Sequence, residues 1–260
     1  MRKKVFSLQQ IIQEKLKEIE KREQVKIIYA LESGSRAWGF ASPDSDYDVR
    51  FIYVRRPEFY LKLEKTRDVI EWQLDDTLDI NGWDLQKALR LLKGSNPTLF
   101  EWADSPIVYR CTEEWNQLKP LICEYFSPRA GFHHYLNTAV NNYRNCLKGD
   151  MVRLKKYFYV IRPLLACKWI LDKNSPPPVF FQTLAEAELE PELQPVIHKL
   201  LDLKIHSPEL ELCPQIEDLN RYIDRNLKEL PDSLPFLKQE TSSGYEELNR
   251  MFLSIIKSIT

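Results

Sequence analysis

Residues 32–54, ESGSRAWGFASPDSDYDVRFIYV, constrain the fold of this chain more than any other segment. The turn Gly34-Ser35 directly follows an apolar run, and Asp46 and Asp48 open a second run of β-branched and aromatic residues. Residues two apart on a strand share a face, so the pattern predicts a strand at 46–54 with both carboxylates on one face. The apolar residues of this strand then face the core, and its charged end is a candidate site.

The two carboxylates would repel each other and raise each other's pKa unless a cation lies between them. A divalent metal ion supplies such a cation. Oxygen ligands without a nearby Cys or His favour Mg²⁺ or Mn²⁺ over zinc. The simplest alternative, for the acidic motif taken alone, is a solvated turn rich in Asp and Ser.

Calcium is a second alternative, because Asp44, Asp46 and Asp48 match the first ligand positions of an EF-hand loop. The rest of that loop does not match. Val49 stands where the EF-hand needs glycine, and Arg55 stands where it needs a bidentate glutamate. A strand also follows where the second helix of an EF-hand belongs, so we set calcium aside.

The Gly34-Ser35 turn lies between an apolar strand and an expected short helix. It offers backbone N–H groups, a hydroxyl and a helix N-terminus, which together suit a phosphate. Combined with two metal-binding carboxylates, the turn predicts a site for a metal-chelated triphosphate.

The segment GSRAWGFASPDSDYDV resembles the signature of the DNA polymerase β-like nucleotidyltransferases, in which Gly-Ser precedes Asp-x-Asp on a strand. Two downstream blocks, DINGWDLQKALRLLKGSNPTLFEWADSPIVY and KKYFYVIRPLLACKWI, extend the resemblance to the RNA-repair-pathway polymerase β family, or YcgL type. The resemblance implies an N-terminal nucleotidyltransferase domain, a mixed sheet flanked by helices, followed by an all-helical domain.

The resemblance also implies roles for individual residues. Gly34 and Ser35 would hold the β- and γ-phosphates, and Asp46 and Asp48 would bind both metal ions. Asp79, on a neighbouring strand, would bind the catalytic metal and help to remove the proton of the acceptor hydroxyl. The residues that compete with Asp79 for this role are Asp75, Asp76 and Asp84.

Further nucleotide contacts are expected from a helix in the second half of the chain. Enzymes of the superfamily that the chain resembles often close the pocket with a lysine and an aromatic residue, and here Lys155, Lys156 and Tyr159 are the candidates. An ordinary core helix with a solvated basic edge explains the same residues. Arg36 is a candidate phosphate ligand, with a surface residue and a salt-bridge donor as the alternatives.

Hydrophobic periodicity predicts an α+β protein. We expect a helix at 7–22, strands at 25–31 and 67–80, a turn at Asn81-Gly82 and a helix starting near Asp84. The second half of the chain has helical patterns at 128–147, 151–172, 192–204, 215–229 and 244–258. We therefore expect a nucleotidyltransferase domain at 1–120 and a helical domain at 121–260.

The net charge of −1 excludes a general electrostatic attraction to nucleic acid, so any such contact must be local. Residues 144–173 carry eight Lys or Arg and two Asp, which makes this stretch the best candidate for a polyanion surface. The five cysteines are widely spaced without a C-x-x-C pair, as in a protein of a reducing compartment. With no apolar stretch of membrane-spanning length, we expect a cytoplasmic protein without membrane contact.

These features predict a metal-dependent nucleotidyltransferase that moves a nucleoside monophosphate from an NTP to an acceptor hydroxyl and releases pyrophosphate. The sequence leaves the acceptor open between an RNA end, a small molecule and a protein side chain. It also leaves open the choice of NTP. The alternatives are a non-catalytic, nucleotide-binding or antitoxin-like module with the same fold and, more weakly, a magnesium-dependent phosphohydrolase.

Overall fold

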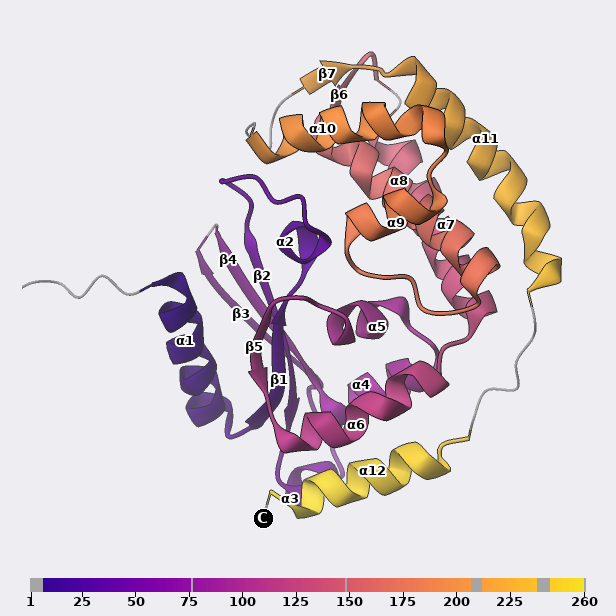
Figure 1. Ribbon diagram of the computed structural model, residues 1–260. Coiled ribbons are helices and arrows are strands. Elements are labelled where there is room, and N and C mark those ends of the chain that lie inside the picture. The colour runs from indigo at the N-terminus through magenta and orange to yellow at the C-terminus, as the bar shows by residue number, and fades with distance from the viewer. Residues whose placement is uncertain (1–6, 76, 148, 207–211, 238–243, 260) are drawn as a thin grey trace, which may run out of the picture.

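A computed structural model describes residues 7–75, 77–147, 149–206, 212–237 and 244–259 (Figure 1). Its centre is a five-stranded sheet with the strand order β3-β4-β2-β1-β5. β2 and β4 are parallel, whereas the other neighbouring strands are antiparallel. The mixed sheet confirms the expected α+β class. The strands are β1 (Lys26–Glu32), β2 (Tyr47–Val54), β3 (Val69–Asp75), β4 (Leu78–Asp84) and β5 (Val108–Cys111).

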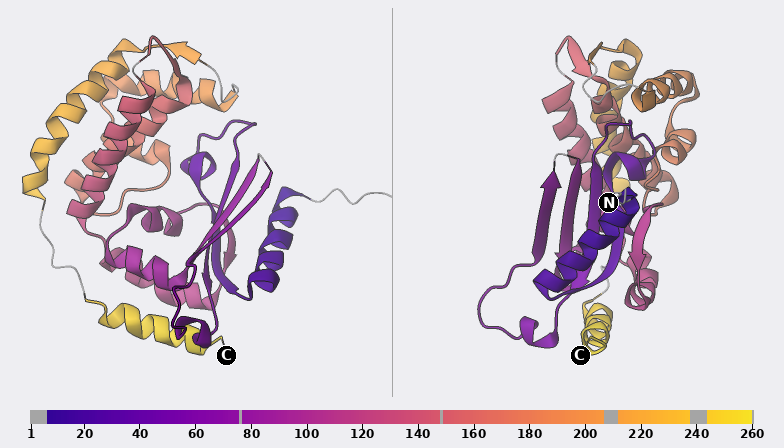
Figure 2. Two further views of the ribbon diagram at one scale, coloured as in Figure 1. Left: turned by 180° about the vertical axis from the view of Figure 1, so that it is seen from behind. Right: turned by 90° about the vertical axis from the view of Figure 1, so that its left-hand side faces the viewer.

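Helix α1 (Leu8–Glu23) covers one face of this sheet, and most of the other helices lie on the opposite side (Figures 1 and 2). Its buried residues Ile12, Leu16 and Ile19 share a core with Val49 and Phe51 of β2. The neighbouring β2 residues that alternate with these face the larger core on the other side. The side of β2 that carries Asp48 therefore faces the helical half of the molecule.

The helices beyond the sheet differ greatly in length. The longest, α8 (Leu154–Lys173), is buried along much of its length and packs along α7 (Pro128–Cys146). The others in the first half are α2 (Gly34–Trp38), α3 (Pro57–Tyr60), α4 (Leu85–Lys93), α5 (Pro97–Ala103) and α6 (Glu113–Glu124). The second half adds α9 (Phe181–Glu188), η1 (Pro191–Leu193), α10 (Gln194–His206), α11 (Glu217–Ser233), η2 (Leu234–Phe236) and α12 (Glu246–Lys257).

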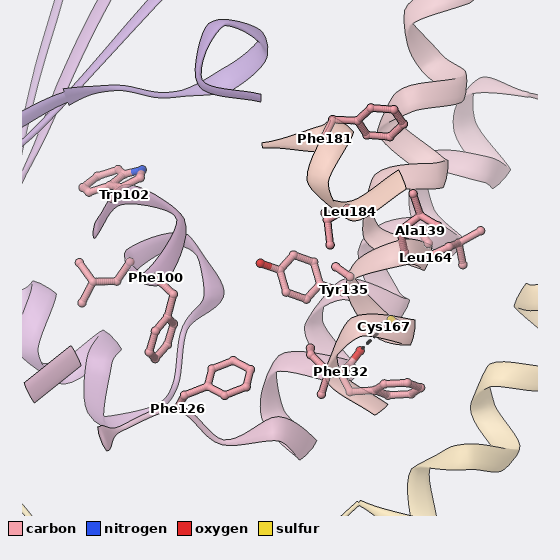
Figure 3. Packing of buried hydrophobic residues seen from close by; sticks show 14 of the residues in the cluster. Phe100, Trp102, Phe126, Phe132, Tyr135, Ala139, Leu164, Cys167, Phe181 and Leu184 are labelled. Atoms are coloured by element: carbon pink, nitrogen blue, oxygen red, sulfur yellow. Dashed lines mark hydrogen bonds between the residues drawn. The ribbon is translucent and has the colours of Figure 1, made fainter. Parts of the chain in front are cut away.

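The larger core runs without a break from the sheet into the long helices. Figure 3 shows part of this core. Phe100 of α5 and Phe126 lie to the left of Phe132 and Tyr135 of α7 in this view. The rings of Phe100 and Phe126 meet edge to face with centroids 5.2 Å apart. The cluster joins residues from both halves of the chain.

The last helix returns to the first half of the chain. α12 packs against α4, and the Phe252 ring lies 5.1 Å from the ring of Tyr60, the last residue of α3. Tyr125 also donates a hydrogen bond to the carbonyl oxygen of Gly244, just before α12. Within the described residues, no helix is both long and apolar enough to cross a membrane.

The expected turn at Asn81-Gly82 is wrong. Both residues lie inside β4, where Gly82 pairs with Phe51 of the parallel strand β2. A Cβ atom on Gly82 would lie 2.1 Å from the Phe51 ring, so the glycine gives the ring its space and marks no turn. The expected single strand at 67–80 is instead a pair, β3 and β4, with its turn near residue 77.

The sequence also did not predict the short two-stranded sheet of β6 (Met151–Arg153) and β7 (Leu212–Pro214). These strands join the start of α8 to the segment before α11. Asp84, expected in the first turn of a helix, is the N-cap of α4 and accepts a hydrogen bond from the Gln86 N–H.

Candidate active site

The parallel pairing of β2 and β4 brings two of the expected site residues together. Asp48 lies directly opposite Asp79 in the register of the two strands. Parallel strands in register point their paired side chains to the same face of the sheet. Carboxylates that are far apart in the sequence therefore meet near the start of both strands.

The residues that competed with Asp79 lie elsewhere or are not described. Asp84, at the far end of β4, is 2% exposed and is occupied as the cap of α4. The side chain of Asp75 and the whole of Asp76 lie outside what the structure describes.

An arginine that sequence analysis missed bridges the two carboxylates. Arg50 Nη2 donates to Asp48 Oδ1 and to Asp79 Oδ2, each at 2.8 Å. Arg50 Nη1 donates to the backbone oxygens of Val49 and Asp79, at 3.1 and 3.2 Å. Arg50 follows Asp48 by two positions, so the alternation that placed the carboxylates on one face could have placed Arg50 there as well.

The contacts of Arg50 also show how the two carboxylates are oriented toward a cation. Oxygens of Asp48 and Asp79 both face one cationic group, and carboxylate oxygens are the ligands that Mg²⁺ and Mn²⁺ prefer. The pair therefore fits a divalent cation. Within the part of the chain that the structure describes, no three His, Cys, Asp or Glu side chains gather into a group that could hold a metal ion.

Gly34 lies against the same carboxylate. Its φ of +62° is in the left-handed region, and a Cβ atom there would lie 2.1 Å from Asp48 Oδ2. The next residue, Ser35, is buried in α2, and the N–H of Ser33 donates to the backbone oxygen of Asp48 at 2.8 Å. The Gly-Ser turn and the carboxylate pair thus form one site.

A buried carboxylate that sequence analysis also missed accepts a hydrogen bond from the backbone of Asp48. Glu32, the last residue of β1, accepts a hydrogen bond from the Asp48 N–H at 2.9 Å and from the Tyr109 hydroxyl at 2.6 Å. Burial raises the pKa of the Glu32 carboxyl above its ordinary value, and these two hydrogen bonds oppose the rise. An acidic residue at the end of an otherwise apolar strand was the available sign.

Asp46 lies one residue before β2 and is exposed. Its backbone is held by Arg36, whose Nε donates to the Asp46 carbonyl at 3.1 Å and whose Nη2 donates to the Ser45 carbonyl at 2.6 Å. The Arg36 guanidinium also lies 3.5 Å from the centroid of the Tyr47 ring. Arg36 therefore fixes the loop that carries Asp46.

The same loop is tied to the helical half by a lysine that sequence analysis missed. Lys204 of α10 is 2% exposed and donates to Ser42 Oγ at 2.9 Å. Ser42 Oγ in turn lies 2.9 Å from Ser45 Oγ. Charged residues are seldom fully buried unless they are paired, so the burial of Lys204 agrees with its hydrogen bond to Ser42.

Lys155, Lys156 and Tyr159 are half-buried near the start of α8. The Tyr159 ring meets the Trp38 ring edge to face at 5.7 Å, and Lys156 Nζ lies 5.1 Å from the centroid of Tyr159. Since Trp38 ends the five-residue helix that begins at Gly34, α2 connects the Gly-Ser turn to this aromatic contact.

A partly open cavity of about 190 Å³ adjoins the same contact, between α2, α5, α7 and α8. Trp38, Tyr159 and Arg162 line it together with Glu101 and Tyr135. Arg162, almost fully buried, donates to Glu101 Oε1 at 2.9 Å, and its guanidinium lies 4.6 Å from the Trp38 ring centroid. The Tyr135 hydroxyl donates to the same Glu101 oxygen, so a polar network forms one wall of the cavity.

The fold and site thus define an α+β protein in which a Gly-Ser turn adjoins a pair of carboxylates on parallel strands. The model of the RNA repair pathway DNA polymerase beta family matches residues 8–254, and this chain belongs to that family. The resemblance inferred from the sequence is confirmed.

One relative is an uncharacterized protein, YcgL, of Bacillus subtilis (strain 168). The two are 45% identical over 254 residues, which cover 97% of this chain and 98% of the relative. A crystal structure of a nucleotidyltransferase-like protein from Exiguobacterium sibiricum 255-15 matches with a TM-score of 0.31 and 16% identity. That match covers 88% of this chain and 75% of the other.

Proposed function

We propose that this protein is a metal-dependent nucleotidyltransferase that transfers a nucleoside monophosphate from an NTP to an acceptor hydroxyl. The observation that carries the proposal is the placement of Asp48 beside Asp79 across β2 and β4, with Gly34 against the Asp48 carboxylate. Membership of a polymerase beta family agrees with this chemistry.

In the reaction, the acceptor oxygen attacks the α-phosphorus, and the bond from that phosphorus to the β-bridging oxygen breaks. Pyrophosphate leaves, and the proton of the acceptor passes to the Asp79 carboxylate or to water. When bound, Mg²⁺ or Mn²⁺ neutralises charge on the triphosphate and lowers the pKa of the attacking hydroxyl. Asp48 and Asp79 would hold the ion, and Asp46, exposed one residue before β2, is the further candidate ligand.

The remaining residues would bind and orient the nucleotide. The N–H groups of the Gly34-Ser35 turn suit the terminal phosphates. Trp38 and Tyr159 present aromatic surface beside the cavity, where a base can stack, and Lys155 and Lys156 add positive charge nearby. Arg36 acts through the backbone of the Asp46 loop, where its hydrogen bonds lie.

We propose an RNA end as the acceptor. The name of the family refers to RNA repair, and residues 144–173 carry the strongest excess of positive charge noted in the sequence. A small molecule and a protein hydroxyl are the other acceptors that the test must distinguish. The division into domains at 1–120 and 121–260 and the cytoplasmic location stay predictions from the sequence.

The test is incubation with each α-labelled NTP, Mg²⁺ or Mn²⁺, and a pool of small RNAs. Label on RNA, on the protein or on a small molecule identifies the acceptor class. Asp48→Asn should lose transfer while keeping the fold. Asp68→Asn, which removes an exposed carboxylate paired with Lys87, is the matched control and should keep activity.

A non-catalytic nucleotide-binding module is the second candidate, because Arg50 already neutralises part of the charge of the carboxylate pair. Such a module would bind NTP without transferring label to any acceptor. Metal-dependent NTP binding that Asp48→Asn abolishes, without transfer in the wild type, would favour it.

A further inference from the structure

We propose that Arg50 is an internal cation that excludes bare divalent ions from the Asp48–Asp79 pair, so that metal enters the site together with a polyphosphate. The inference rests on the proposed function, because it assumes that the pair binds metal. It assigns a role to Arg50, which was not among the site residues expected from the sequence.

The contacts of Arg50 place its charge where a metal ion would be shared. One nitrogen, Nη2, lies 2.8 Å from an oxygen of each carboxylate. The side chain of Arg50 is 18% exposed, against 31% for Asp48 and 51% for Asp79. The Arg50 side chain is therefore less exposed than either carboxylate side chain.

The second nitrogen keeps the guanidinium in place. Arg50 Nη1 donates to the carbonyl oxygens of Val49 and Asp79, which belong to the paired backbones of β2 and β4. These acceptors do not change when the carboxylates bind another cation. Arg50 would therefore stay near the pair even after Nη2 loses its contacts.

The charge of Arg50 then affects the binding of a bare metal ion differently from that of an ion bound to a nucleotide. Arg50 cancels about half of the negative charge of the two carboxylates, and its guanidinium would lie close to any ion bound between them. Like charges held this close in a partly buried site repel strongly. A triphosphate brings its own negative charge, so the complex of metal and nucleotide binds to the site where the ion alone does not.

The experiment measures Mn²⁺ binding to the nucleotide-free full chain, by the decrease of the free Mn²⁺ signal in electron paramagnetic resonance. Arg50→Met should bind Mn²⁺ about tenfold or more tightly than the wild type, because the repelling charge is gone. Arg50→Gln should show the same direction. Arg67→Met, which removes an exposed arginine paired with Glu71, is the control and should match the wild type.

A second arm keeps the proposal testable if Arg50→Met folds poorly. Thermal unfolding of Arg50→Gln should shift upward with Mg²⁺ alone, since the ion relieves repulsion between the two carboxylates. The wild type should respond to Mg²⁺ with a non-hydrolysable ATP analogue and only weakly to Mg²⁺ alone.

Two results would overturn the inference in distinguishable ways. If the wild type binds Mn²⁺ as tightly as both Arg50 variants, Arg50 does not exclude the ion, while the metal site and the proposed function stand. If neither the wild type nor the variants bind Mn²⁺, with or without the ATP analogue, the proposed metal-dependent function fails as well.

Discussion

Gly34 and Asp48 lie so close together that the site has no space for a side chain on the glycine. A Cβ atom at position 34 would lie 2.1 Å from Asp48 Oδ2, and the φ of Gly34 is +62°. The backbone of the turn therefore touches the carboxylate directly. This relationship joins the Gly-Ser turn and the Asp-x-Asp strand in one site.

Gly34→Ala should disturb both the fold and the site. The left-handed backbone strains any residue with a Cβ, at a cost of about 1–3 kcal/mol, and the methyl group would displace the Asp48 carboxylate. We expect lower stability in urea unfolding and loss of metal-dependent nucleotide binding. Gly94→Ala is the matched control, because its Cβ would meet its neighbours only at 3.6 Å and beyond. Equal effects of the two substitutions would contradict the role given to Gly34.

Asp84 should make stability depend on pH. Burial raises the pKa of Asp84 to about 6 from 3.8, while the hydrogen bonds from Gln86 and Tyr60 oppose the rise. A carboxyl with a raised pKa in the folded state favours folding when protonated, so this group stabilises the protein as pH falls from about 7 to about 4.

The comparison that isolates this effect is with Asp84→Asn, because asparagine caps a helix as well as aspartate does. The wild type should gain about 2 kcal/mol relative to Asp84→Asn between pH 7 and pH 4. Urea unfolding at several pH values measures the difference. A difference that is constant with pH would show that Asp84 titrates normally.

Lys204 should control the order of the loop before β2. Its hydrogen bond to Ser42 connects α10 to the serine pair that precedes Asp46. Lys204→Met keeps a long side chain but cannot hydrogen-bond to Ser42, so amide exchange at residues 42 and 44–46 should become about tenfold faster. Hydrogen exchange read by mass spectrometry measures it, with exposed Lys199→Met on the same helix as the control. Unchanged exchange would mean that other contacts hold the loop and that the Lys204 hydrogen bond does not order it.

Local patterns predicted much of the first half of the fold. The helix at 7–22 and the strands at 25–31 and 46–54 agree with the structure to within a residue or so. Each of these elements has a hydrophobic pattern that depends only on neighbouring residues.

The errors arose where the meaning of a residue depends on a distant strand. Gly82 resembled a turn residue because nothing nearby in the sequence shows that Phe51 lies against it. Asp79 was expected only from the resemblance, because its position opposite Asp48 likewise depends on the register of two parallel strands.

The supporting residues of the site were harder still to predict. Lys204 contacts a serine 162 positions earlier in the chain, which no periodicity can reveal. Arg50 and Glu32 did leave local signs, a charge two residues after Asp48 and an acid at the end of an apolar strand. Sequence analysis expected cations elsewhere in the site and overlooked Arg50 between the two carboxylates.

The return of α12 to α3 and α4 has a consequence for synthesis. During translation, Tyr60 and the surface of α4 leave the ribosome well before Phe252, their partner in the last helix. This surface of α3 and α4 therefore stays uncovered until residues 246–257 have been made. Premature termination before residue 246 would leave this apolar surface open to chaperones and to aggregation.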